Sequence, residues 1–336
     1  MPEIAIIGCF AAVLILTPLA ARLGWRIGAV DIPRDGRRMH TDSLPRSGGI
    51  ALFFVYATMT VIVCPRTLAT AAGLFGGAAV FCIGLADDVG ALPPPSRLAV
   101  QTLAAVCAAV GAGVGSPIEL AVAVLWLIAL TNAHNFIDGL DGLLAGTVTN
   151  EGIATAFLLW LTDHGANAIP PLLLAVAALG FLRYNRPPAR VFAGDCGSGT
   201  LGFLLGLAAL PTLLHPTWQL GALAPLLVFA YPLTDLTAAV LRRTASGMSP
   251  FCADRAHLPH RICAMGVSQP RCAALLCAVS APLCLCGVLT ATEALAPFAS
   301  ASAAACCAVL LLIRASLPRS DRKKRKNACK QSKSMV

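Results

Sequence analysis

Carboxylate side chains gather in short polar segments that separate the long apolar runs of this sequence. The pair Asp87-Asp88 follows one run, Asp138 and Asp141 follow another, and Asp195 stands just before a third. Several unpaired carboxylates in one place repel one another and usually require a cation. Oxygen ligands of this kind suit Mg²⁺, with Mn²⁺ as the alternative ion. An ordinary polar cap at a helix end explains one such aspartate, but it does not explain the whole set.

Two of these segments have a spacing that favours convergence. The segment 132–142 reads Asn-Ala-His-Asn-Phe-Ile-Asp-Gly-Leu-Asp-Gly, so Asn132, Asn135, Asp138 and Asp141 recur every three residues. On a helix or a near-helical turn, residues at this spacing share a face. The segment 194–199 is rich in glycine and precedes an apolar run, which predicts a turn whose backbone N–H groups can bind a phosphate. A helix start capped by Ser198 is the alternative interpretation.

Cationic and histidine side chains accompany the carboxylates. Arg97, Arg255, His257 and His260 lie in the neighbouring polar segments. Arginine donates charge-assisted hydrogen bonds to phosphate and carboxylate groups, so these residues are candidates for binding an anionic substrate. Arginines beside apolar runs also orient a membrane protein. The two histidines add little to that orientation signal and therefore indicate binding more clearly.

Long apolar helices must position these residues. Hydrophobic residues make up 57% of the chain and charged residues only 12%, whereas a soluble domain contains about 25% charged residues. The apolar runs are continuous rather than alternating, which favours helices, and about 20 such residues span a membrane. We therefore expect an all-α, polytopic membrane bundle with about eleven transmembrane helices. The expected spans are 3–21, 47–64, 68–86, 98–116, 117–131, 142–161, 167–182, 199–214, 219–240, 272–291 and 296–314.

The basic residues orient these helices. With the amino terminus outside and the carboxy terminus in the cytoplasm, every Lys and Arg except Arg66 lies on the cytoplasmic side, as the positive-inside rule requires. The polar segments described above then share the cytoplasmic face. Residues 317–336 are predicted to form a basic, disordered cytoplasmic tail near anionic membrane lipid. The net charge of +9 thus indicates topology, and we expect no nucleic-acid partner.

A carboxylate-bound cation, a glycine-rich phosphate turn and basic groups at the membrane surface together predict phosphoryl transfer from a soluble nucleotide compound to a lipid. A magnesium-dependent membrane prenyltransferase is one alternative, but it leaves the segment Gly-Asp-Cys-Gly-Ser at 194–198 unexplained. A non-enzymatic transporter is another alternative. Transporters place their polar groups near the middle of the membrane, whereas these groups are expected at one face.

The motifs resemble those of the polyprenyl-phosphate N-acetylhexosamine-1-phosphate transferases, within glycosyltransferase family 4. The matching segments are 87–88, 132–142, 192–198 and 257–260, in the family's order, and the resemblance extends over about residues 40–320. The resemblance implies transfer of a sugar 1-phosphate, GlcNAc 1-phosphate in the first place, from a UDP-N-acetylhexosamine to undecaprenyl phosphate, with release of UMP. Such enzymes begin lipid-linked cell-envelope glycans. It also implies a single integral membrane transferase domain over residues 1–316, located in the bacterial inner membrane with a cytoplasmic active site.

The resemblance implies a role for each matching residue. Asn135 and Asp195 hold Mg²⁺. Asp87 and Asp88 serve the acceptor or the metal region, and Asp138 belongs with them to the catalytic set. The residues implied in substrate binding are Asn132, Asp141, Arg97, Arg255, His257 and His260.

The sequence departs from the family pattern at Pro259. The branch with this Asp-Arg-x-His segment usually has a further histidine there, so one histidine is missing. Because proline restricts the backbone, we expect the change to alter donor binding. An inactive relative of the family is the remaining alternative.

Overall fold

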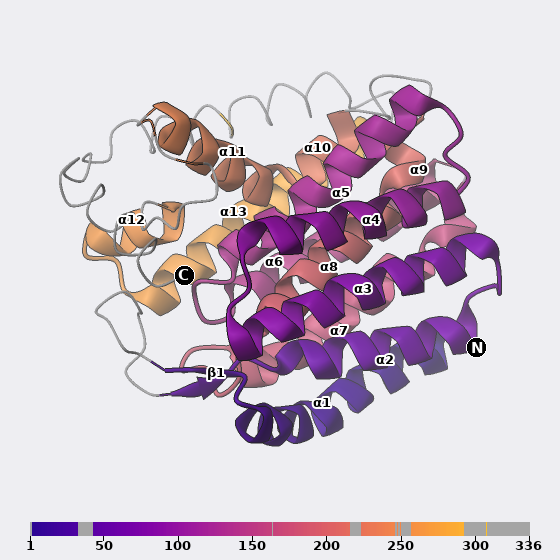
Figure 1. Ribbon diagram of the computed structural model, residues 1–336. Coiled ribbons are helices and arrows are strands. Elements are labelled where there is room, and N and C mark those ends of the chain that lie inside the picture. Colours follow the sequence, from indigo (N-terminus) through magenta and orange to yellow (C-terminus); the bar gives the residue numbers. More distant parts are fainter. Residues whose placement is uncertain are drawn as a thin grey trace.

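The computed structural model of the chain describes residues 2–32, 43–162, 164–215, 223–245 and 257–291, together with Gly247, Ser249 and Cys307. Figure 1 shows that these residues form a bundle of helices, with one short antiparallel pair of strands, β1 (Val30–Asp31) and β2 (Leu44–Pro45). The longer helices are α1 (Pro2–Ile27), α2 (Gly48–Val63), α3 (Leu68–Gly90), α4 (Pro94–Gly111), α5 (Pro117–Ile137), α6 (Leu143–Leu161), α7 (Ile169–Asn185), α8 (Asp195–Ala208), α11 (Ala230–Ala245) and α13 (Gln269–Thr290). The shorter ones are η1 (Gly165–Asn167), α9 (Leu210–Leu213), α10 (Ala224–Val228) and α12 (Leu258–Ala264).

Helix boundaries follow prolines and polar residues of the sequence. Proline occupies the first or second position of α4, α5, α7 and α13, where it removes no intrahelical hydrogen bond. Several boundaries differ from the expected spans, and one of them matters for the site: α5 continues to Ile137 rather than ending at residue 131. Asn132 and Asn135 therefore project from a helix, and Asp87 and Asp88 likewise lie inside the last turns of α3.

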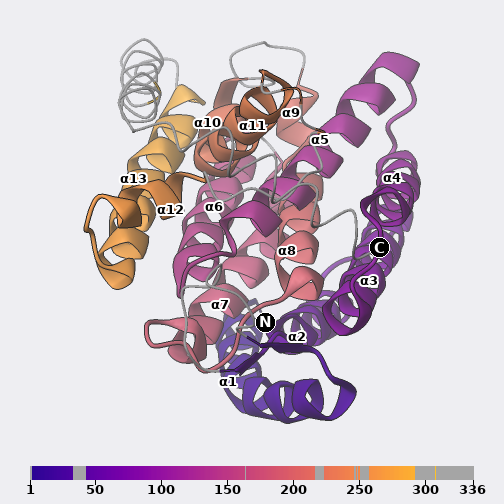
Figure 2. The same cartoon turned by 60° about the vertical axis from the view of Figure 1, so that its left-hand side comes forward.

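Helix α8 lies in the middle of the bundle (Figure 2). It packs against α2, α3, α5, α6 and α7, and most of its residues are buried. Helix α13 packs against α6 and α10, and α12 lies beside it. Because α8 touches α2, α3 and α5, its first turn can meet the polar ends of those helices.

The helices present an apolar surface. Five helical segments among the described residues are long and apolar enough to cross a membrane, namely Glu3–Ile27, Leu68–Gly90, Pro117–Ile137, Gly165–Asn185 and Gln269–Thr290, and α2 is apolar but shorter. Large apolar side chains such as Ile4, Leu68 and Ile118 are exposed, which is typical of a surface that contacts lipid. The fold therefore agrees with the prediction of an all-α membrane protein.

The expected spans up to 272–291 each overlap a described helix or, for 199–214 and 219–240, one longer helix together with a short one, α8 with α9 and α11 with α10. The last expected span, 296–314, and the basic tail 317–336 lie outside the described residues, apart from Cys307. The number of membrane crossings, the orientation of the termini and the domain limit at residue 316 stay predictions.

Candidate active site

The carboxylate of Asp88 fixes the first turn of α8. Its Oδ1 accepts the backbone N–H of Asp195 and its Oδ2 accepts that of Cys196, each at 2.9 Å. These N–H groups have no partner inside the helix, and a negative charge at this end also interacts favourably with the helix dipole. The Asp88 side chain is 0% exposed. Asp88 therefore determines where α8 begins and where the side chain of Asp195 emerges.

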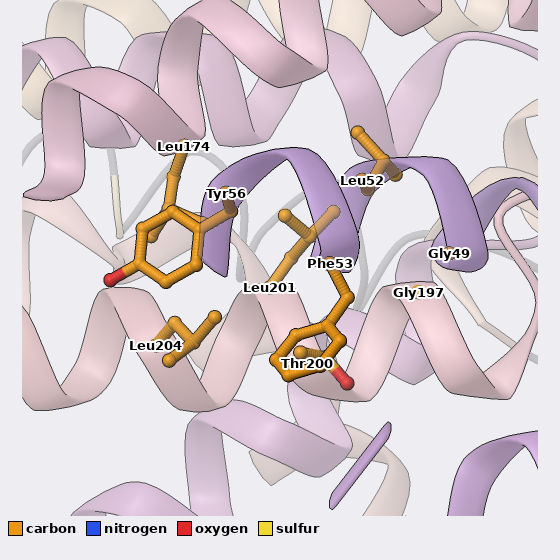
Figure 3. A pocket seen from close by; sticks show the side chains of 9 residues that line it. All are labelled: Gly49, Leu52, Phe53, Tyr56, Leu174, Gly197, Thr200, Leu201 and Leu204. Carbon is orange, nitrogen blue, oxygen red and sulfur yellow. The ribbon is translucent and has the colours of Figure 1, made fainter. Parts of the chain in front are cut away.

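Two glycines allow the chain to approach this point closely. Gly194 has a φ of +75°, and a Cβ there would lie 2.2 Å from the carbonyl oxygen of Arg46. A Cβ at Gly49, in the first turn of α2, would lie 2.3 Å from the backbone nitrogen of Gly197. Figure 3 shows Gly49 and Gly197 at one end of the interface between α2 and α8. Apolar side chains fill the rest of that interface, among them Leu52, Phe53, Tyr56, Leu201 and Leu204.

Two arginines hold the two oxygens of the Asp195 carboxylate. Nη2 of Arg46 lies 2.7 Å from Oδ1 of Asp195, and its Nε lies 3.4 Å from Oδ1 of Asp88. Nη1 of Arg97 lies 2.6 Å from Oδ2 of Asp195 and 2.5 Å from Oδ2 of Asp87. The side chains of Asp195 and Asp87 remain 11% and 14% exposed. Asp87 and Asp195 are thus accessible from outside, whereas Asp88 lies behind them.

Oxygen donors of three side chains meet at Asp195. The side chains of Asp87 and Asn135 both lie close enough to the Asp195 carboxylate to help lower its pKa. Two carboxylates in such contact need a proton or a cation between them, and the Arg97 guanidinium supplies the charge in this structure. Among the described residues no group of three or more His, Cys, Asp and Glu side chains is suited to a metal ion. A metal site here would therefore combine two carboxylates with the amide oxygen of Asn135.

Burial and neighbouring charges shift the pKa values of Asp195 and Asp138 in opposite directions. Burial alone raises the pKa of Asp195, but the adjacent guanidinium of Arg46, together with further charges and hydrogen bonds, outweighs this effect, so the net pKa is lowered. Burial raises the pKa of Asp138 well above its usual value, although Arg46 opposes the shift. Asp195 is therefore ionised near neutral pH, and Asp138 retains a proton more readily.

The residues of the 132–142 segment contact different parts of the protein. Asn135 lies beside Asp195, and Asp138, just after the end of α5, lies beside the backbone N–H of Gly194. Nδ2 of Asn132 instead donates to Oε1 of Gln101 at 3.0 Å and to the Ile128 carbonyl at 2.8 Å. Oδ2 of Asp141 accepts the N–H of Ala189 at 2.8 Å. The expected common face is therefore realised for Asn135 and Asp138, whereas Asn132 faces α4 and Asp141 holds the segment before α8.

His257 is connected to the end of α5 through an aromatic side chain. Its Nδ1 lies 2.8 Å from Oδ2 of Asp235, whose Oδ1 accepts the N–H of Leu258 at 2.9 Å. The ring of His257 packs edge-on against that of Phe136, with 4.9 Å between centroids. The guanidinium of Arg243 lies 5.1 Å from the centroid of the Phe136 ring. Because Phe136 directly follows Asn135 on α5, these contacts place the start of α12 beside the last turn of α5.

Pro259 fits the first turn of α12. It stands two positions after the cap residue His257, where a backbone N–H would have no partner inside the helix. The departure from the family pattern is therefore compatible with the local fold, and its effect on the donor stays a prediction. The His260 ring lies 6.5 Å from that of His257. The predicted residue Arg255 lies outside the described residues.

Arg46 is a site residue for which the sequence predicted only a role in orienting the protein in the membrane. The available signal is its position directly before Ser47-Gly48-Gly49. The N–H groups of Gly48 and Gly49 donate to the carbonyls of Phe192 and Ala193, each at 2.9 Å. This short backbone pairing brings Arg46 to the start of α8.

The fold and the site together define an all-α membrane protein whose ionised side chains meet at one end of its helices. Residues 70–212 match the family described as Glycosyl transferase family 4. The chain is 31% identical to the probable undecaprenyl-phosphate N-acetylglucosaminyl 1-phosphate transferase of Bacillus subtilis, over 79% of this chain and 78% of that protein. It is 34% identical to decaprenyl-phosphate N-acetylglucosaminephosphotransferase of Mycobacterium tuberculosis, over 80% and 78%.

A third relative is the undecaprenyl-phosphate alpha-N-acetylglucosaminyl 1-phosphate transferase of Escherichia coli, which is 27% identical over 80% of this chain and 78% of that protein. The chain belongs to glycosyl transferase family 4, which confirms the resemblance inferred from the motifs. It is therefore a transferase and a multi-pass membrane protein.

Proposed function

We propose that this protein transfers an N-acetylhexosamine 1-phosphate, GlcNAc 1-phosphate in the first place, from a UDP-sugar to undecaprenyl phosphate and releases UMP. The observation that carries the proposal is the meeting of Asp87, Asn135 and Asp195 with two arginines at one end of the bundle. The names of the relatives, which specify undecaprenyl or decaprenyl phosphate and N-acetylglucosamine phosphate transfer, support the substrate classes.

In the proposed reaction, a phosphate oxygen of the lipid acceptor attacks the β-phosphorus of the UDP-sugar. A P–O bond forms to the acceptor phosphate, the bond from the β-phosphorus to the bridging oxygen breaks, and the electron pair leaves on UMP. A phosphate monoester is already largely ionised near neutral pH, so positioning matters more than deprotonation. We assign the accessible Asp87, with its partner Arg97, to the acceptor phosphate, and Asp88 to the support of Asp195.

We assign Asn135 and Asp195 to Mg²⁺, with Mn²⁺ as the alternative ion and Asp87 as a further oxygen donor. The donor set fits, because it contains only hard oxygen atoms. When bound, the ion neutralises negative charge on the diphosphate. The protein contributes an ionised Asp195, which Arg46 maintains, and a fixed start of α8, which Asp88 maintains.

The donor site in this proposal lies between the end of α5 and the start of α12. Since Nδ1 of His257 is engaged by Asp235, Nε2 is the nitrogen that we assign to the donor phosphates, together with His260 and Arg255. Asn132 and Asp141 organise the part of the site that binds the nucleotide, and we place Asp138 between this donor site and the metal site. The distribution of Lys and Arg supports a cytoplasmic active site in the inner membrane.

The test is turnover of the purified full-length protein in detergent with undecaprenyl phosphate, Mg²⁺ and a panel of UDP-N-acetylhexosamines. We expect release of UMP together with formation of a sugar-bearing lipid, fastest with UDP-GlcNAc. A protein that turns over none of these donors would overturn the proposal, and transfer of a prenyl group from a prenyl diphosphate would favour the prenyltransferase alternative.

A further inference from the structure

A buried acid–base pair lies behind the carboxylate site. Nε2 of His134 is 2.7 Å from Oε2 of Glu151, and Nδ1 of His134 is 2.8 Å from the Leu130 carbonyl oxygen. Both side chains are 0% exposed. Oε1 of Glu151 has no hydrogen-bond partner within the described part of the chain. An ionisable pair inside a membrane protein is costly and indicates a function by default, yet the proposed reaction uses neither residue.

This pair joins the helices that carry the site. His134 directly precedes Asn135 on α5, and Glu151 belongs to α6, which follows the turn with Asp138. Helix α8 packs on the ring of His134 so closely that a Cβ at Gly202 would lie 2.8 Å from Nδ1. Gly202 stands about two helical turns after the first residue of α8. The His134 ring therefore contacts α8 on one side and is hydrogen-bonded to α6 on the other.

The direction of His134 on α5 suits a role in setting the rotation of that helix. At about 100° per residue, His134 points about 130° away from the mean direction of Asn132 and Asn135. The hydrogen bond to Glu151 thus holds the far side of α5. Any rotation of α5 that turned Asn135 away from Asp195 would also separate His134 from Glu151.

We propose that the His134–Glu151 pair positions the active site by fixing the rotation of α5 against α6 and α8, and with it the contact of Asn135 with Asp195. This inference rests on the proposed function, since it assigns the pair to the same site. His134 and Glu151 touch no substrate in this account, so they are positioning residues rather than catalytic residues.

The experiment compares three variants of the full-length protein. Glu151→Leu leaves His134 without its partner, Glu151→Gln keeps an acceptor oxygen for it, and Asn150→Leu is the matched control. Asn150 occupies the adjacent position of α6, and its Nδ2 donates to Oγ of Ser280 at 2.8 Å and to the Cys277 carbonyl at 3.1 Å, away from the site. Both leucine variants lose side-chain hydrogen bonds of α6, so an effect on stability alone is common to Glu151→Leu and Asn150→Leu.

We expect Glu151→Leu to lower kcat by about 10- to 100-fold, because small displacements of positioning groups cost this much. The KM for the UDP-sugar should change by less than about threefold, since donor contacts are retained. Glu151→Gln should recover most of kcat, and Asn150→Leu should keep the wild-type kcat for the folded protein. A Glu151→Leu protein whose kcat matches that of Asn150→Leu would overturn the inference.

Binding of Mn²⁺, followed by electron paramagnetic resonance, gives a readout that needs no turnover. Displacement of Asn135 should weaken Mn²⁺ binding in Glu151→Leu by about tenfold, in line with the loss of supporting contacts at metal sites, and leave it unchanged in Asn150→Leu. If the wild-type protein turns over no donor but Glu151→Leu alone loses Mn²⁺ affinity, the positioning role stands and the proposed function fails. Equal Mn²⁺ affinity in Glu151→Leu and the wild type contradicts the positioning role.

Discussion

Replacement of each aspartate of the 87–88 pair by asparagine tests the division of roles that the structure assigns to them. Asp88 accepts two backbone N–H groups of α8 with its two oxygens, whereas asparagine has the same shape but a single acceptor oxygen. In Asp88→Asn one N–H group therefore loses its partner, which costs about 1.5–3 kcal/mol for a bond to a charged acceptor. The weakened contact with the partly exposed Arg46 adds about 0–1 kcal/mol. We expect the free energy of unfolding to fall by about 1.5–4 kcal/mol in total.

Asp87→Asn should behave in the opposite way. Asp87 contacts Arg97 and accepts the N–H of Leu92 at 2.5 Å, and an asparagine oxygen can keep the second contact. Because Asp87 and Arg97 are both partly exposed, the lost charge should cost less than about 1 kcal/mol of stability. Turnover should fall by at least about 100-fold, as when one charge-stabilising group is removed from an active site.

Chemical unfolding in detergent and UMP release by the folded fraction measure these two effects separately. The predicted pattern is a destabilised Asp88→Asn and a stable but inactive Asp87→Asn. An Asp88→Asn protein as stable as the wild type would refute the capping role of Asp88. Equal destabilisation of both variants would refute the claim that only Asp88 supports α8.

Three further predictions follow from the site. Arg46→Ala removes the guanidinium that lowers the pKa of Asp195, so the acid limb of the pH–activity profile should move to higher pH, and Arg46→Lys should move it less. Because the folded-state pKa of Asp195 is depressed, its contribution to stability is present above the unfolded-state pKa and is lost as pH falls through the folded-state pKa. The free energy of unfolding, measured against pH, should therefore fall less at acid pH in Arg46→Ala than in the wild type. An identical fall in both proteins would contradict the assignment. Pro259→His removes no hydrogen bond at the start of α12 and should alter kcat/KM across UDP-sugar donors; an unchanged donor profile would make Pro259 neutral. Chelation by EDTA should abolish turnover, Mg²⁺ or Mn²⁺ should restore it, and Asn135→Ala should require a higher Mg²⁺ concentration; turnover in EDTA equal to that in Mg²⁺ would exclude the metal assignment.

The sequence was sufficient to predict the helical membrane fold and the meeting of Asp87, Asn135 and Asp195. Long apolar runs predict helices regardless of tertiary structure, and acids at the ends of such runs indicate a site because the membrane interior excludes them. The family motifs lie in the loops and helix ends that the apolar runs bring to one face. Those signals are local in the chain, and the structure brings the three residues together.

The different roles of Asp87 and Asp88 could not be predicted from the sequence. Adjacent residues on a helix point about 100° apart, and the packing of α3 on α8 decides which of them caps α8. The same is true of the His134–Glu151 pair, whose members lie on different helices. From the sequence, Arg46 was counted only as a basic residue that orients the protein in the membrane. Its contact with Asp195 could not be predicted, because it depends on the backbone pairing of Gly48 and Gly49 with the segment before α8.

The central claim is that the sugar and its attached phosphate move together to the lipid. The most direct measurement uses a UDP-N-acetylhexosamine with one label in the sugar and a second label in the β-phosphate, incubated with the wild-type protein, undecaprenyl phosphate and Mg²⁺. The proposed reaction predicts that both labels appear in the lipid fraction in equal amounts and that UMP is the released nucleotide. Transfer of the sugar label alone, with the β-phosphate remaining in UDP, would contradict it.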